Sequence, residues 1–212
     1  SAPMQLAQLA ERKAEVLGAL VSATTRRIPV LEKHARASDS VKTCALLAIT
    51  ALATNDQLRL ADTDGAPMLM AISSPTAQLD LRAAPLPSEL PTSAAFNAAY
   101  FLLVALLRQR SRLVHRAVPL LIAAVRGMLF AVAHSAHAAG SDTKLAITTA
   151  FEPEELRGAL PLECVRNLRR LYELLAAHKK VLVRHGSYML ADVVLVLRER
   201  PLPASAQREL LP

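Results

Sequence analysis

The chain has 212 residues, of which 52% are hydrophobic, 20% are charged and only 3% are aromatic. Such a chain can bury a substantial core, which excludes a disordered protein, and its richness in Ala and Leu favours helices over a sheet of β-branched and aromatic residues. The formal net charge of +7 is compatible with an acidic partner, but the few aromatics argue against a protein that reads single strands by stacking bases.

The first 54 residues predict three helices that form a small bundle. Apolar residues recur on one helical face over residues 3–23, starting at Pro3, and Pro29 can occupy the first turn of a short helix over residues 29–35. Ser38 or Asp39 can cap a third helix, which continues to about Leu52. We treat residues 1–54 as an N-terminal helical segment.

Residues 55–92 predict one long proline-rich loop or linker. Five prolines interrupt any continuous helix there, and a turn surrounds Gly65. A β-hairpin pairing residues 58–60 with residues 68–72 is the alternative. The Asp62-Thr-Asp64-Gly run is similar to the start of a calcium loop, but the other oxygen ligands and the closing Glu are missing, which favours a plain turn.

Residues 93–212 predict a C-terminal helical domain that begins with helices over residues 93–109 and 112–139. Pro119 should kink the second helix or lie near its start, and a loop should follow Gly140. Residues 93–141 contain five arginines and no acidic residue. These arginines predict either a solvated helix junction or a corner that contacts phosphates; four of them are candidates for partner contact: Arg108, Arg110, Arg112 and Arg116.

The most regular pattern is a helical hairpin over about residues 160–200. A seam runs from Cys164 to Leu182 at spacings of four and three, which predicts a helix from Pro161 that Gly186 stops. An almost wholly apolar helix over residues 188–198 should fold back antiparallel to it. Asp192 interrupts that apolar helix and needs a partner, because an unpaired buried carboxylate is costly. The candidates are His178, Lys180 and Arg184, and we predict a structural polar pair of His178 and Asp192.

This hairpin carries a resemblance to a known family. The runs VRNLRRLYELLAAHKK (residues 165–180), RHGSYMLAD (residues 184–192) and PLPASAQRELLP (residues 201–212) resemble the C-terminal domain of unhealthy ribosome biogenesis protein two, of the nucleolar Urb/Npa family. The resemblance implies a large helical-repeat protein of pre-ribosomal RNA processing, with nucleolar assembly factors and pre-ribosomal RNA as partners. The chain begins without Met, and we expect it to be part of a longer protein.

Motifs for other functions are missing from the sequence. It has no P-loop, dinucleotide fingerprint, His-Glu-x-x-His motif or nucleophile elbow, so we expect no enzyme and no cofactor. His134 and His137 lie three apart but lack neighbouring ligands, and we predict no metal site. Cys44 and Cys164 lie far apart, which favours a reducing compartment. The most apolar stretches, over residues 94–107 and 117–125, are shorter than a membrane span, and we expect no membrane contact and no small-molecule substrate.

These observations together predict an all-α protein, a helical bundle or solenoid-like helical-repeat segment with one long proline-rich loop. The leading function is a non-catalytic scaffold of large-subunit ribosome biogenesis in the nucleolus, which binds assembly factors. Contact with the phosphates of pre-ribosomal RNA is an additional option that the basic residues leave open. The alternative is a helical protein–protein adaptor unrelated to ribosomes. Besides the four arginines above, the basic residues of the hairpin are candidates for contact: Arg166, Arg169, Arg170, Lys179, Lys180 and Arg184.

Overall fold

The protein is all-α, as the sequence predicts. A computed structural model describes residues 12–25, 35–76, 90–141, 160–199, 202 and 204–210, and no strand occurs in these ranges. The α-helices are α2 (Lys13–Thr25), α4 (Ala35–Thr54), α5 (Gly65–Thr76), α6 (Ser93–Gln109), α7 (Ser111–His115), α8 (Val118–Ser141), α9 (Leu162–Ala177), α10 (Lys179–Glu199) and α11 (Ala204–Leu210), and a 3-10 turn, η1 (Asp62–Asp64), precedes α5.

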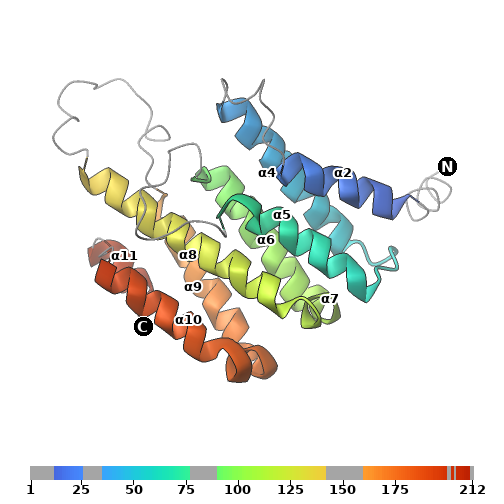
Figure 1. Cartoon of the computed structure of the whole chain (residues 1–212). Coiled ribbons are helices and arrows are strands. Elements are labelled where there is room, and N and C mark those ends of the chain that lie inside the picture. The colour runs from blue at the N-terminus through green and yellow to red at the C-terminus, as the bar shows by residue number, and fades with distance from the viewer. Residues whose placement is uncertain are drawn as a thin grey trace.

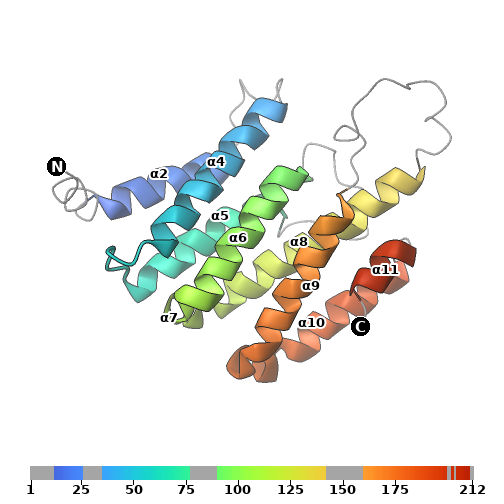
Figure 2. The same cartoon turned by 180° about the vertical axis from the view of Figure 1, so that it is seen from behind.

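The helices stack in two rows. Helices α4, α6 and α9 form one row, in which α4 packs on α6 and α6 on α9 (Figure 2). Helices α2, α5, α8 and α10 form the other row, in which α5 lies between α2 and α8, and α8 between α5 and α10 (Figure 1). The short helix α11 packs on α9. Each helix therefore buries its apolar stripe mainly against its neighbours in the stack, as in solenoid-like proteins.

One hydrophobic core runs through both rows. It includes five fully buried side chains: Ile49 of α4, Met68 of α5, Leu102 of α6, Leu121 of α8 and Leu168 of α9. Its members come from the predicted N-terminal segment, the predicted linker and the predicted C-terminal domain alike. Burial of these aliphatic side chains is the main source of the stability of the stack.

The prediction of a loop over residues 55–92 is wrong for residues 62–76. That stretch forms η1 and α5, and the alternative hairpin is also wrong because its second strand, residues 68–72, lies inside α5. Pro67 falls in the first turn of α5, where a proline removes no helical hydrogen bond. Four apolar residues of α5 are buried: Met68, Leu69, Ala71 and Ile72. Tertiary packing therefore determines the helical conformation of this segment. Residues 77–89 lie outside the described ranges.

The helix predicted from Ser93 to Gln109 is confirmed as α6. The Thr92 hydroxyl caps it by accepting a hydrogen bond from the Ala95 amide, 3.3 Å away. The single helix predicted over residues 112–139 is instead divided at Arg116 and Ala117 into α7 and α8. Pro119 is the second residue of α8, near its start, which was one of the two predicted positions. Gly140 does not end α8, which continues to Ser141.

The predicted hairpin exists, but its turn is at His178 and not at Gly186. Helix α9 ends at Ala177, His178 leaves the helical conformation with a φ of −86° and a ψ of 80°, and α10 runs through Gly186. A glycine inside a helix costs only about 1 kcal/mol relative to Ala, so packing can override it. The early turn lets α10 bury Val181, Met189 and Val196 against the core.

The remaining elements agree with the sequence in part. The predicted first helix corresponds to α2 over Lys13–Thr25, whereas residues 1–11 and 26–34, which include most of the predicted second helix, lie outside the described ranges, as do residues 142–159. Helix α4 begins at Ala35, before the predicted caps Ser38 and Asp39. The apolar stretch predicted over residues 117–125 is longer than predicted: Val118–Ser135 of α8 is long and apolar enough to cross a membrane, but 67% of that segment is buried, as in the central helix of a helical core.

Candidate nucleic-acid interface

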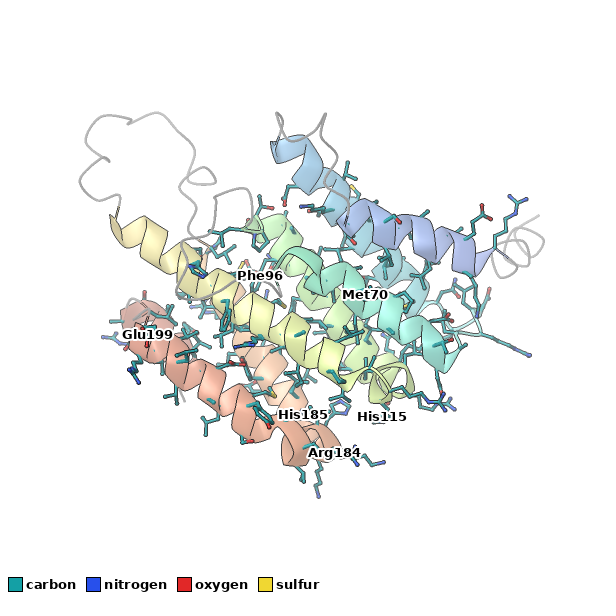
Figure 3. The ribbon with its side chains drawn as sticks, viewed as in Figure 1. Met70, Phe96, His115, Arg184, His185 and Glu199 are labelled. Carbon is teal, nitrogen blue, oxygen red and sulfur yellow. The ribbon has the colours of Figure 1, made fainter. Side chains whose placement is uncertain are left out.

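Six of the ten candidate basic residues lie on what we call the basic end of the stack. Arg108 is in the last turn of α6, Arg112 lies in α7 and Arg116 follows it, all exposed. The other three are exposed at the start of α10: Lys179, Lys180 and Arg184. Figure 3 shows His115, Arg184 and His185 at this same end. Among the described residues none of the six has a carboxylate within ion-pair distance.

Arg110, by contrast, has a structural role. Its Nε donates to the Ala53 carbonyl at 3.0 Å, and its Nη2 donates to the Asn55 carbonyl at 2.7 Å and lies 3.3 Å from Asp56 Oδ1. The guanidinium thus satisfies carbonyls at the C-terminal end of α4 and holds that end against the α6–α7 junction. Arg110 is not available for a partner.

The three arginines of α9 also make intramolecular contacts. Arg166 pairs with Glu209 of α11 at 3.0 Å, and Arg169 pairs with Glu173 one turn away at 2.9 Å. Hydrogen bonding to Arg166 lowers the pKa of Glu209. Such exposed pairs contribute little stability, but they neutralise the cations locally. The candidate contact residues Arg166 and Arg169 therefore lie on a surface of mixed charge.

Arg170 belongs to a polar network between α6 and α9. Its Nη1 donates to Oδ1 of Asn167 at 3.3 Å, and Nδ2 of Asn167 donates to Oδ1 of Asn97 at 3.0 Å. Asn167 is buried, and a buried amide left without partners would be costly. This network fixes the register of α9 on α6.

The predicted pair of His178 and Asp192 is wrong. Asp192 Oδ1 lies 3.1 Å from Nε of Arg126, so its partner comes from α8 and not from α9 or the start of α10. The Arg126 guanidinium also lies over the Phe130 ring, 4.9 Å from its centroid. Burial raises the pKa of Asp192, although Arg126 opposes this effect, and burial together with Asp192 raises the pKa of Tyr172. The cluster joins α8 to α10.

Favourable interactions with helix dipoles explain the positions of only some cations of the basic end. Arg108 lies in the last turn of α6, where a cation is favourable. Lys179 and Lys180, however, begin α10, whose first turn contains no acidic residue, and cations at a helix N-terminus are unfavourable. The C-terminus of α9 adjoins this N-terminus and opposes its field. Local helix stability therefore does not account for the cations at the start of α10.

Two histidines of the basic end were not among the predicted site residues. His115 is exposed in the last turn of α7, and His185 is half-buried one residue after Arg184. The only sequence signal for His115 was its position between Arg112 and Arg116. Acidic residues border this end: η1, which contains Asp62 and Asp64, contacts α7. The cationic surface is therefore limited on the side of α5.

The comparisons with known proteins give no family for this chain. No family model, curated protein or solved structure matches it. The geometry and chemistry of its own residues must therefore support any proposal.

The predicted absence of metal ligands concerns His134 and His137. His134 is buried in α8 and has an interaction partner, whereas the side chain of His137 lies outside the described set. In the described part of the chain, no group of three or more His, Cys, Asp or Glu residues could hold a metal ion. Cys164 is fully buried, and burial raises the pKa of its thiol to about 11, so this sulfur is a core group and not a nucleophile.

Proposed function

We propose that the chain is a non-catalytic helical scaffold of large-subunit ribosome biogenesis, whose basic end contacts the phosphates of pre-ribosomal RNA. The observation that carries the RNA contact is the position of six cations that have no ion-pair partner among the described residues: they lie at the end of α6, in and just after α7 and at the start of α10. Figure 3 shows His115 of α7 and Arg184 of α10 at this same end of the stack. Phosphate binding requires such a cluster and no aromatic platform. The resemblance of residues 165–192 to the nucleolar Urb/Npa family supports the ribosomal setting.

The contacts of the other candidate arginines support the proposed RNA contact, because these arginines are already bound within the chain. Arg110, Arg166, Arg169 and Arg170, the other four of the ten candidates, all engage oxygen atoms of the chain. The six that remain are held on short, well-packed helix ends, so a partner need not order long loops to meet them. Preorganised cations of this kind favour binding, because less conformational entropy is lost on association.

The test is a comparison of three variants that each lose three positive charges. Two remove halves of the basic end, Arg108→Gln/Arg112→Gln/Arg116→Gln and Lys179→Gln/Lys180→Gln/Arg184→Gln. The control, Arg166→Gln/Arg169→Gln/Arg198→Gln, removes cations that pair within the chain. Fluorescence anisotropy with a structured pre-ribosomal RNA fragment at low salt should show that both basic-end variants bind at least about tenfold more weakly than the control. Equal loss in all three variants would mean that only net charge matters and would contradict the proposal.

The second candidate function is a helical adaptor for other proteins, unrelated to ribosomes. The exposed apolar side chains of α10 favour a protein partner of some kind. Imaging of the tagged full-length protein separates the two candidates. Accumulation in the nucleolus would support the ribosomal scaffold, whereas exclusion from the nucleolus would contradict it and favour the adaptor.

A further inference from the structure

Helix α10 has an exposed apolar stripe, which consists of Val183, Leu190 and Val194. Their side chains are 85%, 65% and 56% exposed, respectively. Separations of seven and four residues place the three on one face of the helix, with Ser187 between them. Single exposed apolar residues are ordinary on a protein surface, but an aligned set over three turns is a recognised mark of an interaction surface.

The stripe faces away from the stack. Val181, Met189 and Val196 occupy the opposite side of α10 and are buried against the core. In the row α2, α5, α8 and α10, the interior helices α5 and α8 are packed on both sides, whereas α10 packs on α8 and lies at the edge (Figure 1). A helix at the end of such a stack needs a polar outer face or a covering element, and α10 has an apolar one.

Positive charge borders the stripe. Lys180, Arg184 and Arg198 are exposed, and the helical rotation of 100° per residue places them along one flank of Val183 and Val194. The only exposed acidic residue of α10 in the described chain is Glu199, which lies 3.5 Å from Arg198. Asp192 lies on the packed side and pairs with Arg126. The stripe therefore has a basic edge that selects against cationic partners.

We propose that this face of α10 binds an amphipathic α-helix of another protein, with apolar residues spaced by three and four and acidic residues along one edge. The bound helix would lie beside α10 and extend the row by one member. Val183 to Val194 spans about 16 Å, so a partner helix of roughly 12 to 15 residues covers the stripe. The apolar contact does not depend on RNA binding, because the stripe contains none of the six cations, although its basic edge shares Lys180 and Arg184 with the basic end.

The probe is a synthetic 18-residue helical peptide with Leu at a 4-3-4 spacing and Glu along one edge. Its binding to the wild-type chain is compared by fluorescence anisotropy with that of a scrambled peptide and of a peptide with Lys in place of Glu. We expect the Glu peptide to bind best. The variant Val183→Ser/Leu190→Ser/Val194→Ser should bind it about 100-fold more weakly, since each apolar contact accounts for roughly fivefold.

The control variant Leu47→Ser/Phe101→Ser removes half-exposed apolar side chains from α4 and α6 and should bind the peptide normally. A second variant, Lys180→Glu/Arg184→Glu, keeps the stripe and should reverse the preference from the Glu peptide to the Lys peptide. Circular dichroism checks that each variant is folded.

Two results would overturn the proposal. One is equal binding of the Glu and scrambled peptides, or no loss of binding in the stripe variant. The other is a wild-type dimer in sedimentation velocity that the stripe variant abolishes while neither chain binds the peptide, because the occupant would then be a second copy. Unchanged RNA affinity of the stripe variant would separate this surface from the basic end.

Discussion

Replacement of Gly65 by Ala should destabilise the protein strongly, although Ala is the better helix former. A Cβ atom at this position would lie 2.1 Å from the carbonyl oxygen and 2.6 Å from the carbonyl carbon of Leu113. These are backbone atoms of α7, so no side-chain rotation relieves the overlap. Gly65 has a φ of −66° and a ψ of −35°, which any residue can adopt. Steric overlap is therefore the whole reason for glycine here.

The expected cost follows from two opposing effects. Overpacking in a close-packed region costs about 1–3 kcal/mol or more, and the gain in helix propensity from Gly to Ala recovers less than about 1 kcal/mol. A net loss of about 2 kcal/mol should lower the melting temperature by roughly 4–8 °C in a chain of this size. Thermal and urea unfolding followed by circular dichroism measure this difference.

Gly18 is the matched control. It lies within α2, is exposed, and a Cβ atom there would meet nothing within 4 Å. Gly18→Ala should therefore stabilise the protein by about 0.5–1 kcal/mol through helix propensity alone. If Gly65→Ala were as stable as Gly18→Ala, the close packing of α7 against the start of α5 would be wrong.

Three further predictions concern buried titratable groups. Arg126→Gln should lower the free energy of unfolding by about 1–2 kcal/mol at pH 7, more than Asp192→Asn does. The substitution leaves the ionised Asp192 carboxylate, whose side chain is only 16% exposed, without its cation. Since Arg126 lowers the pKa of Asp192 in the fold, the loss should shrink as the pH falls and Asp192 is protonated; a loss independent of pH would contradict the pairing. Tyr172→Phe should reduce the loss of stability above pH 10 in alkaline unfolding, because burial raises the pKa of Tyr172 in the folded state and ionisation favours the unfolded chain; an unchanged alkaline profile would contradict this. Cys44 should react with a thiol reagent in the native protein while Cys164 reacts only after unfolding, and two fast equivalents would refute the burial of Cys164.

The sequence predicts the helices best where the apolar period is long and uninterrupted. Helix α6 begins and ends at the predicted residues, and the seam residues Cys164, Leu168, Leu171 and Leu175 are all buried in α9. Two of the errors come from reading a proline and a glycine as helix breakers. Pro67 lies in the first turn of α5, where a proline is tolerated, and Gly186 lies within α10, where buried neighbours outweigh its local preference.

The sequence predicts that the candidate site is rich in basic residues, but it does not predict which of them share an exposed surface. The excess of arginine near residues 108–116 and 166–184 is visible in the sequence. Which cations remain free depends on partners distant in the chain: Glu209 for Arg166, the Ala53 carbonyl for Arg110 and Asp192 for Arg126. No local pattern gives these pairings, because the packing of helices that are distant in the chain creates them.

The dependence of RNA affinity on salt concentration tests the proposed phosphate contacts most directly. If all six free cations of the basic end contact phosphates, the logarithm of the association constant should fall with the logarithm of salt concentration with a slope of about −4 to −5. The variant that loses Lys179, Lys180 and Arg184 should show a slope nearer about −2. A slope near zero for the wild-type chain, or the same slope for the variant, would contradict RNA binding by the basic end.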